Sequence, residues 1–293
     1  MKTAINEVSF VEVVLKGISQ IMLQENKWTG LIFLLGLFAG RWQYSVAALL
    51  ATVVATTTAK VLNYDPAEIK SGLYGFSAAL VGVALIILFE DTLLVWLSII
   101  VGSSLAAIIQ HFFVVRKIPV FTLPFILVTW MSVFLIQNYS NTSVEALSFS
   151  KVSTTQYDNL FAIIKGFGQV IFQGAVLSGI LFILGVFIGN PMAALYGLAA
   201  SFLGACFAMN YGQSLDQINQ GLFSFNGVLI AIVFSGSKKT DGIWVLVGSC
   251  ITFFIHNWLV ELPFFNRVGG VFTFPFVAGT WLTFLIKRVA AKH

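Results

Sequence analysis

The chain has 293 residues, of which 58% are hydrophobic and only 10% are charged, and its net charge is +4. A soluble domain carries about 25% charged residues because water must solvate its surface. This composition therefore argues against a soluble protein and predicts one surrounded by lipid. The small, dispersed positive charge argues against a nucleic-acid partner and fits the basic excess of cytoplasmic membrane-protein loops. The first sixteen residues mix Lys and Glu into an apolar pattern, so we expect no cleaved signal peptide.

Apolar segments follow one another along the chain, six in each half. They cover about residues 8–23, 29–40, 44–62, 73–89, 92–115 and 118–137, and then 160–173, 178–189, 191–212, 221–236, 242–260 and 268–286. None alternates with the period of two that barrel strands require, so all are predicted to be helices. The polar residues 138–159, rich in Ser, Thr and Asn, predict an exposed linker.

The two halves repeat each other at a nearly constant offset. GISQIMLQENKWTGLIFLLGLFAG (17–40) returns as GFGQVIFQGAVLSGILFILGVFIG (166–189), and GLYGFSAALVG (72–82) returns as GLFSFNGVLIA (221–231). FTLPFILVTW (121–130) returns as FTFPFVAGTW (272–281). Internal duplication in an apolar chain is typical of carriers and channels whose path lies between the repeats. We expect a first membrane repeat (1–137), an extracytoplasmic linker (138–159) and a second membrane repeat (160–293).

Three apolar segments are too short to cross a bilayer, which takes about 20 residues. They are residues 29–40 and the pieces near 10–23 and 160–173. Short segments at matching places in both halves are typical of re-entrant helices that line a site. One re-entrant helix in each half would leave five crossings, and an odd number turns the second repeat upside down.

Basic residues lie near both ends of the chain and are scarce in the linker. They are Lys2, Lys16, Lys287, Arg288 and Lys292 near the ends, against Lys151 alone within 138–159. Because cytoplasmic segments carry the excess of Lys and Arg, both termini are predicted to be cytoplasmic and the linker external. Ten crossings satisfy this arrangement.

A repeated GxxxG pattern is formed by Gly36 and Gly40 and again by Gly185 and Gly189. Small residues at this spacing let helix backbones approach closely. We therefore predict tight helix packing at these glycines in preference to a direct role in a pore.

Long stretches of the chain contain no Asp, Glu, Lys, Arg or His. They are Tyr44–Ala59, Gly72–Phe89, Gly166–Gln213 and Gly221–Gly236. Coupled transport normally needs ionisable groups at membrane depth, so the solute is predicted to be neutral. His256 and His111 are interpreted as hydrogen-bonded or snorkelling residues in preference to a proton relay. No nucleophile–base pair or metal-binding cluster indicates an enzyme.

The duplication retains polar residues inside the apolar segments. The pairs are Gln20 with Gln169, Gln24 with Gln173, Thr129 with Thr280, and Thr122 with Thr273. A glutamine amide can both accept from and donate to a small polar solute, although membrane glutamines also bond neighbouring helices. The threonines could line a path or bond their own helix four residues back. Pro124 and Pro275 are expected to break the preceding helix.

Apolar residues are duplicated beside these polar ones. Phe76 and Leu80 are spaced to share one helical face, as are Phe225 and Leu229. Phe172 lies three residues after its glutamine in the second half, where the first half has Leu23. Two opposed apolar faces would make a slot for a flat molecule, with amide oxygens at its edge to replace water.

At these residues the chain resembles the urea transporter family, over essentially its whole length. The resemblance is carried by GLYGF with LVG and GLFSFNGVL, by the GxxQ entries ending at Gln20 and Gln169, and by the two PF…TW blocks. It implies an all-α polytopic membrane protein of two inverted repeats, each with five transmembrane helices and one re-entrant helix, assembled as a homotrimer. It also implies passive transport of urea across the plasma membrane (bacterial inner membrane), with urea and lipid as partners and no cofactor.

The resemblance also implies which residues contact urea. Gln20, Leu23, Phe76 and Leu80 would form one mouth of a narrow filter, Gln169, Phe172, Phe225 and Leu229 the other, and Thr129 and Thr280 the central constriction. The chain departs from the family at Ser77, where the motif has Asn, as at Asn226 in the second half.

Other small neutral solutes remain alternatives, through a channel or a coupled carrier: ammonia, short amides or water. An ammonia channel would be expected to carry paired pore histidines, and a water or glycerol channel two Asn-Pro-Ala turns, whereas GNPM (189–192) occurs once. A coupled carrier would need a charged site at depth. We predict a passive, channel-like urea transporter and not an enzyme.

Overall fold

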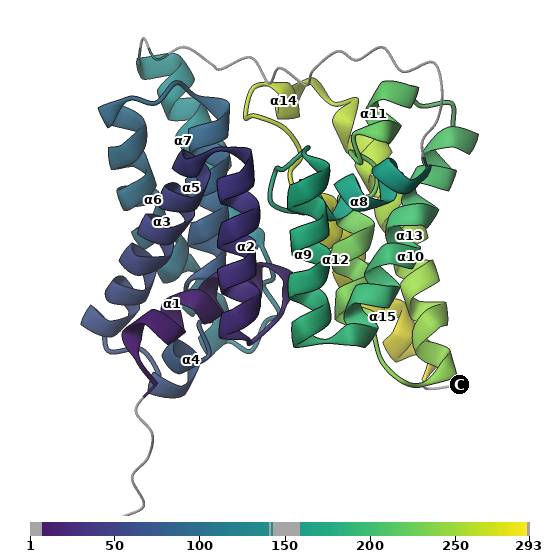
Figure 1. The fold of residues 1–293 in the computed structure, drawn as a ribbon, viewed down its shortest axis with the longest axis horizontal. Helices are drawn as coiled ribbons and strands as arrows, with labels where there is room; N and C mark the ends of the chain where they lie inside the picture. Colours follow the sequence, from purple (N-terminus) through teal and green to yellow (C-terminus); the bar gives the residue numbers. More distant parts are fainter. Residues whose placement is uncertain (1–7, 141, 143–158, 292–293) are drawn as a thin grey trace, which may run out of the picture.

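The computed structural model describes residues 8–140, 142 and 159–291, which form helices joined by short turns (Figure 1). The first half contains α1 (Phe10–Ser19), η1 (Gln20–Met22), α2 (Lys27–Gly40), α3 (Trp42–Val61), α4 (Pro66–Lys70), α5 (Phe76–Leu88), α6 (Leu93–Val115) and α7 (Leu123–Tyr139). The second contains α8 (Asn159–Gln169), α9 (Val176–Gly189), α10 (Pro191–Asn210), α11 (Leu215–Asn219), α12 (Phe225–Phe234), α13 (Lys239–Val260), α14 (Pro263–Asn266) and α15 (Phe274–Ala290). The all-α prediction is confirmed, and the described residues form no β-sheet.

The helices of the two halves follow one another in the same order. The pair α2 and α9 have 14 residues each, α3 and α10 have 20, α4 and α11 have 5, and α7 and α15 have 17. Among the described residues, η1 of the first half and α14 of the second have no counterpart helix in the other half. Most of the predicted linker lies outside the described residues, and its first two positions belong to α7. The duplicated sequence thus corresponds to duplicated secondary structure.

Local sequence signals explain where several helices begin. Asp65 caps α4, with its Oδ1 accepting from the main-chain N–H groups of Ala67 at 2.7 Å and Glu68 at 3.2 Å, and Pro66 fills the first helical position. The prolines expected to break a preceding helix instead stand in the first turn of the following one, Pro124 in α7 and Pro275 in α15. They mark helix starts because proline lacks the N–H that an interior position requires.

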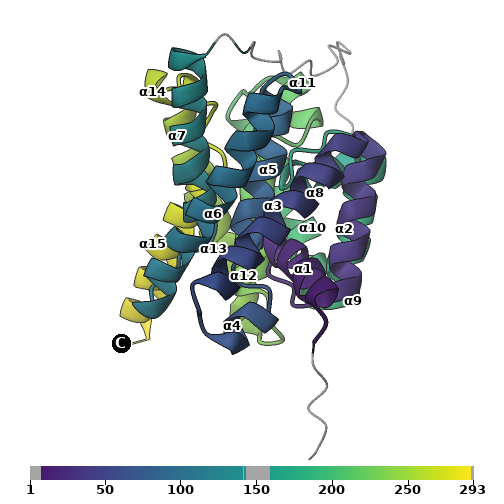
Figure 2. The ribbon, with the colours of Figure 1, turned by 90° about the vertical axis from the view of Figure 1, so that its left-hand side faces the viewer.

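Helix α5 lies at the centre of the molecule. All of its residues from Phe76 to Leu88 are buried, which is expected of a helix that is hydrophobic on every face. Figure 2 shows α5 and α12 between the α2–α9 pair on one side and α7 and α15 on the other. The central helices of both halves are therefore shielded from lipid by the others.

Helices α2 and α9 lie side by side where the halves meet (Figures 1 and 2). The rings of Phe33 and Phe182 meet edge to face, with centroids 5.2 Å apart. The Thr29 hydroxyl donates to the Gly185 carbonyl at 2.6 Å. Its repeat mate Ser178 donates to the carbonyl of the mate glycine in α2 at 2.7 Å. The two helices thus approach closely at the GxxxG glycines, which confirms the packing role predicted for them.

Gly36→Ala should destabilise the fold. A Cβ at Gly36 would lie 2.4 Å from Cε1 of Phe182, whose ring is fully buried. Overpacking of this kind costs about 1–3 kcal/mol. A lower midpoint of thermal unfolding in detergent would show the loss, with Gly242→Ala as the control, because the nearest atom to its Cβ would lie 3.6 Å away. Equal midpoints for the two variants would contradict this packing.

Two further sets of contacts join the halves on the α7–α15 side. Trp130 Nε1 donates to the Gly270 carbonyl at 2.8 Å, and its mate Trp281 donates to the Pro119 carbonyl at 2.7 Å. The hydroxyls of Thr122 and Thr273, themselves repeat mates, are 2.7 Å apart. Contacts between the halves therefore come in reciprocal pairs, as across a two-fold axis.

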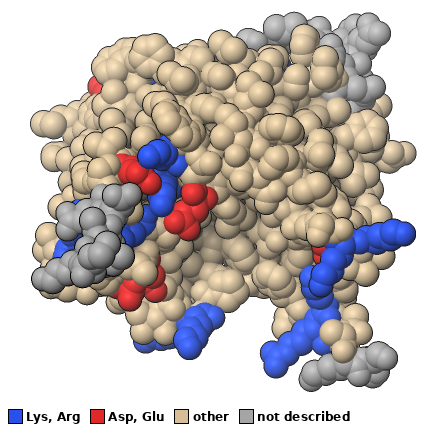
Figure 3. Space-filling model, turned by 60° about the horizontal axis from the view of Figure 1, so that its bottom comes forward, with Lys and Arg blue, Asp and Glu red and all other residues tan. Residues whose placement is uncertain are grey.

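The surface matches a membrane environment. Helices α3, α6, α10 and α13 are long and apolar enough to cross a bilayer, while α2, α5, α7, α8, α9 and α12 are apolar but shorter. Large apolar side chains point outwards, among them Phe38 at 63% and Leu93 at 76% exposure. Figure 3 shows charged side chains gathered at the lower end, with a broad uncharged surface above. The protein is a membrane protein with several apolar helices. The expected ten crossings stay a prediction.

Candidate functional site

The predicted site residues divide into two sets and a threonine pair. The first set is Gln20, Leu23, Phe76 and Leu80; the second set is Gln169, Phe172, Phe225 and Leu229; the threonine pair is Thr129 and Thr280. Each set is drawn from the end of the first helix of its half and from the central helix that packs near it, η1 with α5 and α8 with α12. The fold thus brings the elements of each set together.

The two glutamines have the same environment. Gln20 Nε2 donates to the Ser71 carbonyl at 3.1 Å, and Gln169 Nε2 donates to the Gln220 carbonyl at 3.0 Å. Ser71 and Gln220 are the residues that end α4 and α11. Each amide nitrogen is therefore held by the main chain, whereas each Oε1 accepts no hydrogen bond from the described residues. The nitrogen of each glutamine thus bonds a neighbouring segment, whereas its oxygen is left for a solute.

Leu23 and Phe172 stand in the left-handed backbone region, with φ of 58° and 60°. Few residues other than glycine adopt this conformation, and such strain is concentrated at functional sites. The main-chain N–H of each donates back to the carbonyl of its glutamine, Leu23 to Gln20 at 3.0 Å and Phe172 to Gln169 at 3.1 Å. The turn fixes each apolar side chain relative to the amide three residues earlier.

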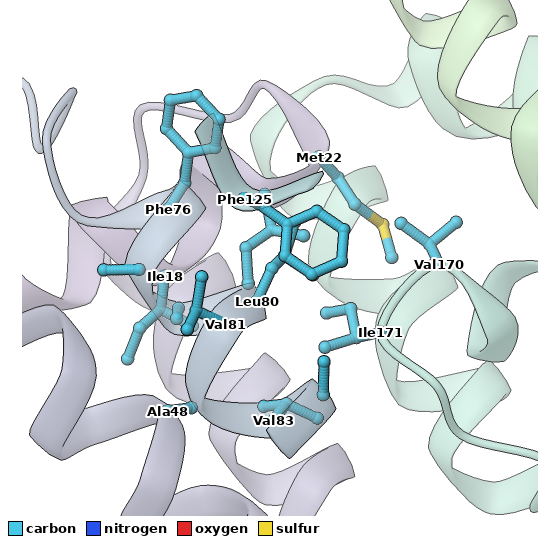
Figure 4. Close-up of a cluster of buried hydrophobic side chains, with 14 of the residues drawn as sticks. Ile18, Met22, Ala48, Phe76, Leu80, Val81, Val83, Phe125, Val170 and Ile171 are labelled. Atoms are coloured by element: carbon cyan, nitrogen blue, oxygen red, sulfur yellow. The ribbon is translucent and has the colours of Figure 1, made fainter. Parts of the chain in front are cut away.

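The apolar members differ in burial. Leu80 and Leu229 are 0% and 1% exposed, whereas Leu23 is 39% exposed. Figure 4 shows Phe76 and Leu80 along α5, and Met22 of the first half facing Val170 of the second. The first set therefore runs from a fully buried leucine on α5 to a partly exposed one at the end of η1.

The two phenylalanines of the second set, Phe172 and Phe225, contact other aromatic rings and not each other in the described residues. The Phe172 ring lies 6.0 Å from Phe125 and from Phe272, centroid to centroid. The Phe225 ring contacts His256 at 5.9 Å, and no contact between the Phe172 and Phe225 rings occurs among the described residues. The slot between two opposed apolar faces therefore stays a hypothesis, and Phe172 packs with Phe125 and Phe272.

Phe121 and Phe272 are candidate site residues that the sequence analysis did not single out. Both have a φ of 48°, and their rings contact the mate phenylalanines Phe276 at 5.3 Å and Phe125 at 5.5 Å. The signal was present in the repeated FTxPF block, which they begin. A repeated aromatic residue at the start of a repeated turn could have been chosen on that basis.

The two threonines are equally buried, at 0% exposure, but differ in partners. The Thr280 hydroxyl donates to the Phe276 carbonyl four residues back at 2.7 Å. Thr129 Oγ1 is buried and has no hydrogen-bond partner within residues 8–140 or 159–291. An orphan of this kind in a native structure needs an explanation, and a passing solute would supply the missing partner.

Other duplicated polar residues have structural roles. Gln24 and Gln173 donate to carbonyls two residues earlier, at 2.8 and 3.2 Å. Their Oε1 atoms occupy the space beside Gly189 and Gly40 of the opposite half, which a Cβ would fill. Thr122 and Thr273 bond each other, as described above. These pairs lock the halves together.

Asn226 makes hydrogen bonds in the second half that the shorter Ser77, its counterpart in the first half, does not make. Its Oδ1 accepts from the Phe276 N–H at 3.2 Å, and its Nδ2 lies 3.4 Å from the Phe272 carbonyl and 3.3 Å from His256 Nδ1. The Asn226 side chain thus ties α12 to the start of α15. Among the described residues, the shorter Ser77 hydroxyl reaches only Gln110 Oε1, at 3.4 Å.

Comparison with known proteins identifies the family. A family model described as "Urea transporter" matches residues 11–288. Urea transporter 1 of Rattus norvegicus is 25% identical over 246 residues, and urea transporter 1 of Capra hircus is 28% identical over 246 residues. Each alignment covers 78% of this chain and 64% of the relative, so the chain spans less than two thirds of the curated relatives' length. These relatives are mammalian, and the expected bacterial type stays a prediction. Because the family model covers most of its length, the chain belongs to the urea transporter family.

Proposed function

We propose that the protein passes urea down its gradient across a membrane, along a path between the two halves. The observation that carries the proposal is the pair of anchored glutamines. Each has its nitrogen fixed on a main-chain carbonyl and its oxygen without a partner in the described residues. Urea presents N–H donors that lose water on entering an apolar path, and a fixed amide oxygen replaces that water. The family is one of transporters, which agrees with the expectation that the chain is not an enzyme.

The residues take three roles in this mechanism. The first set forms one mouth, the second set forms the other, and Thr129 and Thr280 face the constriction between them. The apolar residues exclude water, so each hydrogen bond to urea is made in a medium where an unpaired donor is costly. Binding must still be weak enough for release, as in channels with successive sites.

Transport is uncoupled in this proposal. The central helix α5 and its counterpart α12 carry no ionisable residue, and ion coupling normally requires such groups at membrane depth. A neutral solute then moves along its own gradient alone.

Stopped-flow light scattering of proteoliposomes tests the proposal. A urea gradient should shrink and refill the vesicles faster than protein-free liposomes, while glycerol should give no difference. An ionophore that collapses the proton gradient should leave the urea rate unchanged. Urea rates equal to those of empty liposomes would contradict urea transport, and rates abolished by the ionophore would contradict uncoupled passage.

The membrane arrangement extends the proposal. The repeats are inverted, each with five crossings and a re-entrant helix, and both termini are cytoplasmic. Two observations support this: α4 lies at the lower end and α11 at the upper end of Figure 1, and the start of α1 and the end of α15 both lie at the lower end. The homotrimer rests on the family resemblance, and light scattering of the purified protein would measure it.

The cytoplasmic position of the C-terminus predicts a labelling result. In a variant without Cys206 and Cys250, a cysteine at Arg288 should react with an impermeant thiol reagent only after the cells are opened. Arg288 lies in the last turn of α15, where basic residues favour the cytoplasmic side. Labelling on intact cells would place this end outside.

A further inference from the structure

Three ionisable or hydrogen-bonding side chains from separate elements meet beside the first set. Glu68 comes from α4, Tyr74 from the turn before α5, and His111 from α6. The Tyr74 side chain is 1% exposed, and its hydroxyl bonds Glu68 Oε2 and lies 3.0 Å from His111 Nδ1. The His111 ring stacks on Tyr64, in the loop between α3 and α4, with centroids 3.5 Å apart and planes 5° from parallel.

With Glu68 as a carboxylate, the roles of donor and acceptor in this network follow from its chemistry. An ionised carboxylate only accepts, and a phenol has one hydrogen to donate. Tyr74 therefore donates to Glu68, and its oxygen accepts from the Nδ1–H of His111. Burial, and then the bond to Glu68, raise the pKa of Tyr74 above its usual value. The phenol thus stays a neutral donor at physiological pH.

The network holds the turn of residues 71–75, which touches the first set on two sides. The Ser71 carbonyl accepts from Gln20 Nε2 at 3.1 Å, and Phe76 follows the turn as the first residue of α5. Gly72, with a φ of 80°, fits so closely that a Cβ there would lie 2.4 Å from a main-chain nitrogen of α1. A movement of the turn would therefore displace Gln20 and Phe76 together.

In the second half, the positions that match the network carry no Glu, Tyr or His. Gln217, Phe223, Asn257 and Gln213 stand in the places of Glu68, Tyr74, His111 and Tyr64. Gln213 Nε2 donates to Asn257 Oδ1 at 2.6 Å, and Phe223 packs on His256 with centroids 5.7 Å apart. Gln169 still reaches its carbonyl at the same position, Gln220. The repeat therefore supplies both a tolerated replacement for each network residue and an internal comparison.

We propose that Glu68, Tyr74 and His111 are positioning residues for solute capture at the first mouth, acting through the turn of residues 71–75 on Gln20 and Phe76. This inference rests on the proposed function, because it assigns these residues to the same path. It makes the two mouths unequal, since Gln217, Phe223 and Asn257 stand in these places at the second.

Tyr74→Phe tests the proposal, because it removes one hydroxyl and leaves the residue that the second half has at Phe223. The urea concentration for half-maximal flux should rise about fivefold, the effect of losing roughly one hydrogen bond, while maximal flux per folded protein should hold. A purely structural role would lower maximal flux, through fewer active molecules, and leave the half-maximal concentration unchanged. That outcome overturns the proposal.

Combined variants show whether Tyr74 acts through Gln20. In a Gln20→Leu background, Tyr74→Phe should add less than its full effect, because only the route through Phe76 remains. In a Gln169→Leu background it should have its full effect, because sites in separate networks add. Equal effects in both backgrounds would overturn the proposed route. Thr58→Val is the control, because it removes a hydrogen bond of 3.1 Å between Thr58 of α3 and Ser104 of α6, neither of which belongs to the turn. It should leave the half-maximal urea concentration unchanged.

Hydrogen exchange separates this inference from the proposed function. Amides of residues 71–76 should exchange faster in Tyr74→Phe than in Thr58→Val and the unchanged protein, whether or not the protein passes urea. If urea flux is absent from the unchanged protein, the proposed function fails, and exchange alone decides whether the network holds the turn. Unchanged exchange together with an unchanged half-maximal concentration would overturn the positioning role.

Discussion

Replacing Thr129 by isoleucine should reduce urea flux to the rate of protein-free liposomes. Thr129 is fully buried on α7, where added volume finds no space without displacing neighbours. If its side chain faces the narrowest part of the path, the larger residue closes it. Stopped-flow scattering measures the loss, and the glycerol rate, already that of empty liposomes, should not change. Urea flux within twofold of the unchanged protein would place the constriction elsewhere.

Valine at the same position separates the hydroxyl from the volume. Valine has the shape of threonine, and Thr129 Oγ1 has no partner in the described part of the chain. Removing an unsatisfied buried hydroxyl should leave the unfolding midpoint equal or higher. Flux in the Thr129→Val, Thr280→Val double variant should nevertheless fall about tenfold, since about 1.4 kcal/mol of added barrier suffices. Thr129 should carry the larger share, because the Thr280 hydroxyl already donates to the Phe276 carbonyl.

Thr283→Val is the matched control for this pair. Its hydroxyl is equally buried and donates to the Gly279 carbonyl at 2.7 Å, one helical turn from Thr280. It should alter stability slightly and flux not at all. Equal losses of flux in Thr283→Val and Thr129→Val would mean that these hydroxyls affect only the helices that carry them.

The double variant Gln20→Leu, Gln169→Leu should show a large rise in the urea concentration for half-maximal flux. Each change removes one amide oxygen from one mouth, and a donor left without its partner costs roughly 1–3 kcal/mol. Each single variant should raise the half-maximal urea concentration several-fold. The rise in the half-maximal urea concentration of the double variant should approach the product of the two single rises, because the glutamines bond separate carbonyls and share no partner.

Gln173→Leu provides the comparison for this effect. It loses an amide bond to a main-chain carbonyl, that of Ile171 at 3.2 Å, but belongs to the contact with the opposite half. It should lower stability and leave the half-maximal concentration unchanged. Urea affinity that is normal in a folded double variant would assign Gln20 and Gln169 to helix packing alone.

The duplication made the helices predictable, because two independent copies of each signal agree. Segment boundaries were less accurate where backbone turns interrupt an apolar run. Residues 8–23 were expected to form one helix, but α1 ends at Ser19, η1 follows, and Leu23 ends it with a positive φ. The helix expected over residues 118–137 begins only at Leu123. The five-residue α4 was missed altogether, although an Asp-Pro start signalled it.

The partners of the site residues could not be predicted, because they depend on contacts between distant segments. Gln20 and Gln24 read alike in the sequence, yet one anchors on Ser71 and the other fills the space beside Gly189. Thr129 and Thr280 share the same sequence setting but differ in bonding. Repeat symmetry selects candidates, and only packing separates solute contacts from structural ones.

The reciprocal bonds between the halves mean that each half carries both the donor and the acceptor of every paired contact. Thr29 with Gly36, and Trp130 with Pro119, provide one copy of each in the first half. A chain of half this length would thus present a self-complementary surface and could pair with a copy of itself. Joining the copies in one polypeptide makes their encounter intramolecular and independent of concentration. It also lets the sequences of the two halves diverge. Leu23 can therefore differ from Phe172, and His111 from Asn257, without a matching change at the other mouth.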